Sequence, residues 1–586
     1  MATTMHADRS RRHQARLSKM IVGVALLSAF ASVSRTSAHD DAKEPTKNEH
    51  DERGDIQANE HDWPMIGHDS ANTRSQPFER RISPGNVHRL SLKWTSPTTG
   101  DVSATPAVVN GAVYFGDFGG TLWKLDAGTG AVIWSRRVPD YTGNAGDYAR
   151  TSPSLAGNTL VVGIIKGSTS VPGPNLLGID ATTGELRWKS QIHPDSHAAM
   201  TGSPILVGNT IITGISANGA STPATATFRG ALVALNAQTG AIRWRTYSLP
   251  DNGDVPGGYS GATMFSPPAV DESLGLVYGT FGQPYTEPPG VTACHAAHGG
   301  SAGFLESCEK PGAYLRSIVA FDLKTGKPKW SYRVLGHEPW VRACGNQPAS
   351  VTWCPAESDG EKWDMGGSGP NVMRVRFGGH RRDDDRGRDN GEWRDVVGFG
   401  GKSGVYTLLD AKTGKFIWNT LVGPGGDQGG MEWGTAFDGD RIYVSITNQH
   451  HIPYQLTENG VLLGTTPVTG GSWAALDPRT GAILWQTADP KTETLPAPLG
   501  VVGVWDLAPV TVANGLVYGA SMAKLGPEMY ALDAATGAIL WQYDAGSSVN
   551  AGPAVVNGSV YWGSGYSRSA EGSANHQLFA FSLDGR

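Results

Sequence analysis

The stretch YALDAATGAILWQY, residues 530 to 543, contains a phrase that recurs along the chain. Upstream copies with the same order of Asp or Asn, two variable residues, Thr-Gly, three variable residues and Trp are KLDAGTGAVIW, GIDATTGELRW, ALNAQTGAIRW, AFDLKTGKPKW, LLDAKTGKFIW and ALDPRTGAILW. Thr-Gly favours a tight turn because Gly accepts positive φ, and the Asp side chain can accept hydrogen bonds from the turn backbone. Each copy therefore predicts a β-hairpin that presents a tryptophan at a fixed offset.

A second phrase consists of two short β runs about a turn. It precedes each hairpin, as TPAVVNGAVYFG from residue 105 does, and it occurs once more without a hairpin after it, as GPAVVNGSVYWGS from residue 552. The extra copy needs a hairpin, and the two chain ends supply it. QLFAFSLDG (577 to 585) provides one strand, and RLSLKWTSPTTG (89 to 100) provides another, which carries Trp94. The sequence thus predicts an all-β fold, an eight-bladed β-propeller with tryptophan docking, whose last blade is closed by N- and C-terminal strands.

The first 38 of the 586 residues are typical of an export signal, because basic residues precede the apolar run MIVGVALLSAFASV and a small-residue end. An uncleaved anchor is the alternative, although the run is short for a stable membrane span. Residues 39 to 60 are charged and predict a disordered leader, which leaves 61 to 586 for the propeller. Without these 38 residues the formal net charge changes from −6 to −11 (42 basic minus 53 acidic residues), and an acidic chain argues against nucleic acid as a partner.

All the cysteines, Cys294, Cys308, Cys344 and Cys354, fall in one region. In an exported chain, local pairs of Cys294 with Cys308 and of Cys344 with Cys354 are the simplest disulfides, although the sequence leaves the pairing open. Covalent haem is disfavoured because no C-x-x-C-H spacing occurs.

The same region is where the repeat is interrupted. The intervals from Trp244 to Trp330 and from Trp330 to Trp418 are about twice that from Trp94 to Trp134, so long insertions lie in the fourth and fifth blades. Long loops on a rigid scaffold often build a site or a lid, and a decorated surface without chemistry is the alternative.

The repeat and several phrases between blades resemble those of the quinoprotein alcohol dehydrogenases, with polyvinyl alcohol dehydrogenase and its relatives as the nearest likeness, over roughly residues 62 to 586. The phrases that carry the resemblance are DYARTSP (147 to 153), HAAMTGSP (197 to 204), FRGALVALN (228 to 236), GGKSGVYTLLD (400 to 410), GPGGDQGGMEWG (423 to 434) and SVNAGPAVVNGSVYWGSGY (548 to 566). The resemblance implies pyrroloquinoline quinone (PQQ) held on the propeller axis.

PQQ is a planar, acidic ortho-quinone, which binds best among cations and flat side chains. The residues that match cofactor contacts of the family are Arg150, Phe265, Lys402, Trp433 and Asn550. The resemblance also makes Asp364, in KWDMGGSGPN, the general base that takes the hydroxyl proton, with Lys402 facing the quinone oxygens. The plainer interpretations are a surface cation for Arg150, a packing tryptophan for Trp433 and a turn cap for Asp364.

The sequence departs from the family at three positions. Phe265 stands where the family has a stacking Trp, Gln283 where it has an Asn or Asp ligand of Ca²⁺, and Asn218 or Gly219 where it has a Glu ligand. Because Ca²⁺ prefers carboxylate oxygens, the resemblance leaves Gln283 as a weak metal ligand and puts the Ca²⁺ site in doubt.

Two functions follow as expectations. The first is a periplasmic or secreted PQQ-dependent dehydrogenase that oxidises an alcohol, polymeric or secondary alcohols included, and passes electrons to an external acceptor such as a cytochrome c or a quinone. The second is a cofactor-free propeller that acts as a binding or assembly scaffold.

Overall fold

The computed structural model describes residues 58–168, 170, 173, 175–217, 226–298, 306–334, 367–378, 391–426, 428–568 and 572–586. They all belong to one compact unit, Gly54–Arg586. The predicted signal segment and nearly all of the predicted leader lie outside the described residues. Among the described residues, no helix is both long enough and apolar enough to cross a membrane.

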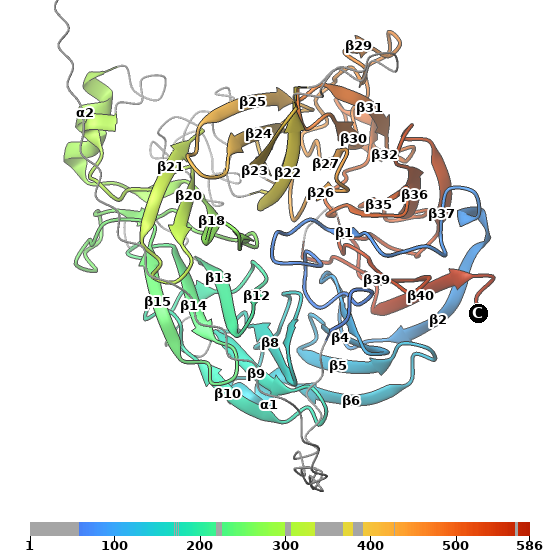
Figure 1. Ribbon diagram of the computed structural model, residues 1–586, viewed down its shortest axis with the longest axis horizontal. Helices are drawn as coiled ribbons and strands as arrows, with labels where there is room; N and C mark the ends of the chain where they lie inside the picture. The colour runs from blue at the N-terminus through green and yellow to red at the C-terminus, as the bar shows by residue number, and fades with distance from the viewer. Residues whose placement is uncertain are drawn as a thin grey trace, which may run out of the picture. The chain divides into compact units, whose positions relative to one another are not determined.

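Eight antiparallel four-stranded sheets, the blades, are arranged in a ring (Figure 1). From the inner to the outer strand, blade 1 is β3 (Ala107–Val109), β4 (Ala112–Gly116), β5 (Thr121–Asp126) and β6 (Val132–Arg137); blade 2 is β7 (Ser154–Ala156), β8 (Thr159–Gly163), β9 (Leu176–Asp180) and β10 (Leu186–Ser190); blade 3 is β12 (Ile205–Val207), β13 (Thr210–Ala217), β14 (Ala231–Asn236) and β15 (Ile242–Tyr247); blade 4 is β17 (Ala269–Asp271), β18 (Leu276–Phe281), β20 (Ser317–Asp322) and β21 (Pro328–Arg333).

In the second half of the ring, blade 5 is β22 (Pro370–Phe377), β23 (Glu392–Gly400), β24 (Val405–Asp410) and β25 (Phe416–Leu421); blade 6 is β26 (Ala436–Phe437), β27 (Ile442–Ile446), β30 (Ser472–Leu476) and β31 (Ile483–Ala488); blade 7 is β34 (Thr511–Ala513), β35 (Leu516–Ala520), β36 (Met529–Asp533) and β37 (Ile539–Tyr543); blade 8 is β38 (Ala554–Val556), β39 (Ser559–Ser564), β40 (Gln577–Leu583) and β2 (Leu90–Pro97). The predicted eight-bladed propeller is confirmed.

Shorter elements decorate the ring. They are β1 (Ser75–Gln76), β11 (Ala198–Ala199), β16 (Ser260–Gly261), β19 (Pro284–Thr286), β28 (Thr457–Glu458), β29 (Val461–Leu462), β32 (Thr492–Leu495), β33 (Gly500–Gly503), the helices α1 (Val138–Thr142) and α2 (Pro289–Ala297), and the 3₁₀ turns η1 (Val87–Arg89) and η4 (Glu306–Cys308).

The ring closes in blade 8, where strands from the two ends of the propeller pair. β2 runs antiparallel to β40, from Leu90 opposite Leu583 to Pro97 opposite Gln577. This is the predicted split hairpin, and it joins the two ends of the propeller within one blade.

The repeated Asp, Thr-Gly and Trp of the sequence perform separate tasks. In blade 1, the Asp126 carboxylate accepts hydrogen bonds from the backbone N–H groups of Gly128 and Thr129 at 3.0 and 2.8 Å, which closes the turn. Each tryptophan indole N–H donates to a backbone carbonyl of the following blade at 2.8 to 3.2 Å. The pairs are Trp94 to Ala127, Trp134 to Ala181, Trp188 to Ala237, Trp244 to Leu323, Trp330 to Ala411, Trp418 to Pro478, Trp485 to Ala534 and Trp541 to Leu90.

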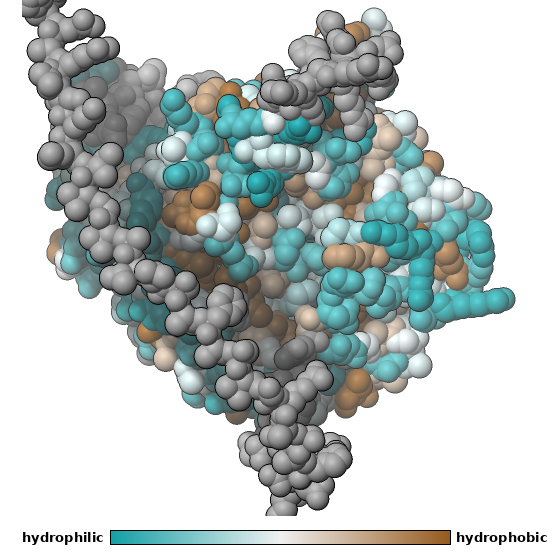
Figure 2. Space-filling model, in the orientation of Figure 1, coloured by the Kyte–Doolittle hydropathy of each residue, from teal (hydrophilic) through white to brown (hydrophobic). Residues whose placement is uncertain are grey.

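For seven of the eight tryptophans, the turn glycine of the following blade lies against the docked indole ring, the exception being Trp541, which docks on the split hairpin of blade 8. At Gly537, with φ of +75°, a Cβ would come within 2.4 Å of Trp485 Cε3, and at Gly414 within 2.5 Å of Trp330 Cε3. The repeated motif therefore encodes the contact between blades as well as the hairpin. Apolar side chains fill the remaining space between neighbouring sheets. The face of the molecule that is visible in Figure 2 carries both hydrophilic and hydrophobic residues.

An N-terminal arm, residues 62–76, crosses the middle of the ring (Figure 1, blue). Its backbone, together with the Gln76 side chain, hydrogen-bonds inner-strand residues of seven blades. These residues are Val108, Leu155, Val270, Val372, Phe437, Val512 and Val555. The arm was not predicted from the sequence. Its contacts are made largely through the main chain, which leaves no repeated side-chain signal.

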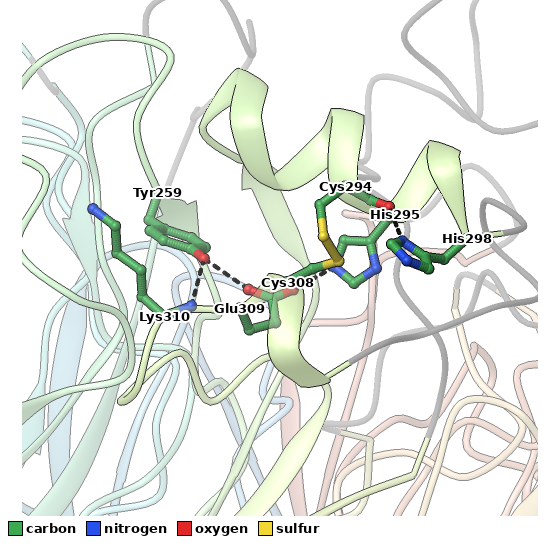
Figure 3. Close-up of a disulfide and its surroundings, with 7 residues drawn as sticks. All are labelled: Tyr259, Cys294, His295, His298, Cys308, Glu309 and Lys310. Carbon is green, nitrogen blue, oxygen red and sulfur yellow. Dashed lines mark hydrogen bonds and ion pairs between the residues drawn. A yellow bond between two sulfur atoms is a disulfide. The ribbon is translucent and has the colours of Figure 1, made fainter.

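The described part of the blade 4 insertion contains α2 and a disulfide between Cys294 and Cys308 (Figure 3), which confirms that predicted pair. The residues that follow these two cysteines form a second link, since His295 Nε2 lies 3.2 Å from Glu309 Oε1 and both side chains are buried. The Tyr259 hydroxyl donates to Glu309 at 2.8 Å. Cys344 and Cys354 lie outside the described residues, so their pairing stays a prediction.

Candidate active site

A cavity lies on the propeller axis, where the inner strands of the blades begin. It is lined by Ile66, Ser103, Ala104, Thr105, Arg150, Ser152, Thr201, Gly202, Ser203, Phe265, Pro267, Trp433, Pro509 and Asn550. Apart from Ile66 of the arm, each of these residues immediately precedes the first strand of a blade. The same register in successive blades therefore brings distant parts of the sequence to one site.

The arm forms the floor of this cavity. Its backbone contacts fall three residues beyond lining residues of the same blades: Val108 beyond Thr105, Leu155 beyond Ser152, Val270 beyond Pro267 and Val512 beyond Pro509. Since an extended strand rises about 3.3 Å per residue, the arm crosses the channel roughly 10 Å further along it. The arm therefore covers one end of the cavity.

Arg150, a predicted cofactor contact, lies in the cavity among aromatic rings. The carbon centre of its guanidinium is 5.0 Å from the centroid of the Trp433 ring, 5.7 Å from that of Phe118 and 5.8 Å from that of Tyr566. One of its nitrogens donates to the Tyr566 hydroxyl at 3.3 Å. These partners are neutral, so they orient the cation and leave its charge available to an anionic ligand.

Lys402 and Phe265, two more predicted contacts, are neighbours. The Lys402 ammonium lies 4.7 Å from the centre of the Phe265 ring, which itself packs edge-on against Trp433 at 6.2 Å. The ammonium also pairs with Glu432 at 3.2 Å, and both side chains are largely buried. Sequence reasoning missed Glu432, although it is adjacent to Trp433 in the phrase MEWG.

Three polar atoms of cavity-lining residues are buried without a hydrogen-bond partner among the described residues: the indole Nε1 of Trp433, the hydroxyl of Ser152 and Oδ1 of Asn550. Leaving such groups unpaired costs about 1–3 kcal/mol each. They comprise an N–H donor, a hydroxyl and a carbonyl acceptor. A polar ligand with both acceptor and donor groups would satisfy all three.

These residues fit PQQ. Trp433, Ser152, Arg150 and Lys402 could donate to its carboxylate and quinone oxygens, and Asn550 Oδ1 could accept from its pyrrole N–H. Phe265 and Trp433 offer apolar ring surfaces for a planar molecule.

The residues described around the cavity do not fit Ca²⁺. None of the lining residues is a carboxylate, and Glu432 nearby is paired with Lys402. Gln283 is buried on the loop after β18, beside Ala262, and is not among the lining residues. Asn218 and Gly219 lie outside the described residues, as does the predicted base Asp364.

A pair of buried acids that the sequence did not indicate, Asp489 and Asp506, lies between blades 6 and 7. Desolvation by burial raises the pKa of both, and for Asp506 the neighbouring Asp489 carboxylate raises it further. Two carboxylates so placed cannot both ionise cheaply. The pair therefore holds a proton when the chain folds.

Comparison with known proteins gives the cavity a family context. The family model described as the β-propeller domain of glucose, ethanol and alcohol dehydrogenases, named for PQQ, matches residues 63–362. The chain belongs to this family. A second model, described as outer membrane protein assembly factor BamB, matches residues 469–586, which include blade 7 and most of blade 8.

Characterised relatives extend the similarity over most of the chain. A polyvinylalcohol dehydrogenase of Pseudomonas sp is 27% identical over 564 residues, which span 89% of this chain and 77% of that protein. A quinohemoprotein alcohol dehydrogenase of Comamonas testosteroni is 24% identical over 90% of this chain and 76% of its own. The crystal structure of quinohemoprotein alcohol dehydrogenase from Comamonas testosteroni shares the fold with a TM-score of 0.63 at 21% identity, over 90% of this chain and 81% of that one. The predicted family and enzyme class, a PQQ-dependent alcohol dehydrogenase, are confirmed.

Proposed function

We propose that this protein binds PQQ in the axial cavity and oxidises an alcohol there. The observation that carries the proposal is the meeting of Arg150 with three unpartnered buried polar atoms in one cavity on the axis of a propeller of this family. Lys402 does not line the cavity itself but lies against the lining residue Phe265. The similarity to polyvinylalcohol dehydrogenases supports a secondary or polymeric alcohol as the substrate.

The residues divide the chemistry between them. PQQ, when bound, supplies the acceptor for the two electrons removed from the alcohol carbon. Arg150 and Lys402 neutralise the negative charge of the ligand, and Glu432 holds the Lys402 ammonium in place. The floor formed by the arm excludes water from one side. The role of base for the hydroxyl proton stays with Asp364 as a sequence-based prediction.

The electrons leave to an external acceptor, for which a cytochrome c or a quinone is proposed because the sequence has no C-x-x-C-H haem motif. Export to the periplasm or medium is proposed from the signal-like residues 1–38 and from the Cys294–Cys308 disulfide, a bond typical of oxidising compartments. Cell fractionation followed by N-terminal sequencing would test it. A cytoplasmic chain that retains residues 1–38 would contradict export.

The activity is tested by incubating purified protein with PQQ, with and without Ca²⁺, and then following reduction of an artificial dye by a primary alcohol, a secondary alcohol and polyvinyl alcohol. We expect dye reduction that depends on both PQQ and alcohol. PQQ-loaded protein that reduces no dye with any of the alcohols would refute the activity. Failure to bind PQQ under either condition would favour the scaffold function instead.

A further inference from the structure

Arg74 of the arm is fully buried on the propeller axis, directly beneath the cavity. Its guanidinium donates to the carbonyl oxygens of Val510 and Ile66 at 2.8 Å and to the hydroxyl of Thr105 at 3.2 Å. Ile66 and Thr105 both line the cavity. A Cβ on Gly552, two residues beyond the lining residue Asn550, would come within 2.2 Å of a guanidinium nitrogen. Arg74 therefore reaches from the arm to the cavity floor.

This cation has no anionic partner among the described residues. Its recorded hydrogen-bond acceptors are backbone carbonyls and the hydroxyls of Thr105 and Thr511, all of them neutral. Burial lowers the pKa of Arg74 to about 9, with no nearby carboxylate to raise it. Buried charges in proteins are normally paired, because removing an ion from water is costly. An anion in the cavity above would offset that cost.

Two other arginines show the contrast. Arg150, inside the cavity, is the cation that the sequence already indicates. Arg316, which precedes β20 in blade 4, is only 1% exposed but does not line the cavity. Arg74 combines complete burial, neutral partners and contact with the cavity wall, so its charge acts on whatever occupies the cavity.

We propose that Arg74 is a specificity-determining cation in the floor of the axial cavity, which selects a planar ligand bearing carboxylates by supplying the positive charge beneath it. The proposal rests on the proposed binding of PQQ in that cavity. Arg74 acts through Thr105 and Ile66 and through its field, without contact with the reacting atoms. Its effect therefore falls on ligand affinity and charge preference more than on the chemical step.

The test measures equilibrium dissociation constants of the full-length chain for two probes. One is PQQ, and the other is benzene-1,3,5-tricarboxylate, a planar tricarboxylate without redox chemistry. The variants are Arg74→Gln, which keeps hydrogen-bond donors but loses the charge, and Arg74→Lys, which keeps the charge. Arg316→Met is the matched control, since it removes a buried arginine elsewhere. Thermal melts of each variant verify folding.

We expect Arg74→Gln to weaken the binding of both probes at least tenfold, Arg74→Lys to recover most of that loss, and Arg316→Met to bind both as the wild type does. Wild-type affinity in Arg74→Gln, or equal weakening in Arg74→Gln and Arg74→Lys, would overturn the inference in favour of a packing role. If Arg74→Gln does not fold, the affinity of the wild-type protein for PQQ is compared with its affinity for the trimethyl ester of PQQ. Equal affinities for the two compounds would overturn the charge preference.

The two proposals fail in distinguishable ways. Wild-type protein that binds the tricarboxylate through Arg74 but does not bind PQQ would refute the proposed function and support the role of Arg74. Binding of PQQ that does not change with the charge at position 74 would refute the role of Arg74 and support the proposed function. Protein that binds neither probe would refute both.

Discussion

Lys402 shows how one residue serves both the stability of the fold and the site. Its ammonium is largely buried between the Glu432 carboxylate and the Phe265 ring. The sequence indicated Lys402, Phe265 and Trp433 through phrases shared with a known family. It did not indicate Glu432, because a carboxylate that pairs with a lysine some thirty residues away leaves no local pattern.

The first prediction concerns this ion pair. Lys402→Ala should lower the free energy of unfolding by about 3 kcal/mol, because it removes one partner of a buried pair. It should also weaken PQQ binding at least tenfold, as expected when a charge-assisted contact is lost. The matched control is Lys412→Ala, an exposed lysine of the same blade. If Lys402→Ala bound PQQ as tightly as Lys412→Ala, the assignment of Lys402 to the cofactor would be wrong.

The second prediction uses the buried acids Asp489 and Asp506. Burial raises the pKa of both, and the neighbouring Asp489 carboxylate raises the pKa of Asp506 further. The folded chain then binds more protons than the unfolded chain above about pH 4, the ordinary carboxyl range. The contribution of this pair to stability should therefore be greatest below that pH and fall as pH rises toward the raised pKa, by about 1.4 kcal/mol per pH unit for one proton.

Asp506→Asn should flatten this dependence, because the amide stays neutral and can donate to Asp489. Denaturant unfolding between pH 4 and 8 measures the slope, and exposed Asp440→Asn is the control. A slope unchanged from wild type in Asp506→Asn would show that the pair does not hold the proton.

At the scale of the element, the blade contact is the feature that the sequence predicts best. The docking tryptophans and turn glycines recur with fixed spacing, and the structure places seven of the eight indoles against the turn glycine of the next blade. The arm shows the opposite case. Its main chain hydrogen-bonds six blades through carbonyl and N–H groups, which every residue has, and the Gln76 side chain reaches a seventh, so only the structure could reveal the floor of the cavity.

The third prediction separates docking from backbone strain. Gly537 and Gly546 both have φ near +75°, but only at Gly537 would a Cβ overlap the docked Trp485. Gly546→Ala should cost about 1–2 kcal/mol for the left-handed backbone alone. Gly537→Ala should cost roughly 1–3 kcal/mol more because of overpacking. Thermal melting of the two variants under the same conditions tests the order, and equal melting temperatures would contradict the docking role.

At the scale of the whole molecule, the ring brings together residues that hold equivalent positions in different blades, and these residues form the site. Residues as distant as Arg150 and Asn550 meet because each precedes an inner strand of its own blade. The sequence predicted the eight blades, the closure of blade 8 and the Cys294–Cys308 pair. It could not predict that Gln283 lies away from the lining residues, because a loop position after a strand does not specify where the side chain points.

The most direct test of the central claim is a crystal structure of the protein soaked with PQQ. We predict difference density for one planar ligand in the axial cavity, in contact with Arg150, Trp433 and Asn550. Full occupancy of PQQ elsewhere on the molecule, with no density in the axial cavity, would contradict the claim that this cavity is the cofactor site.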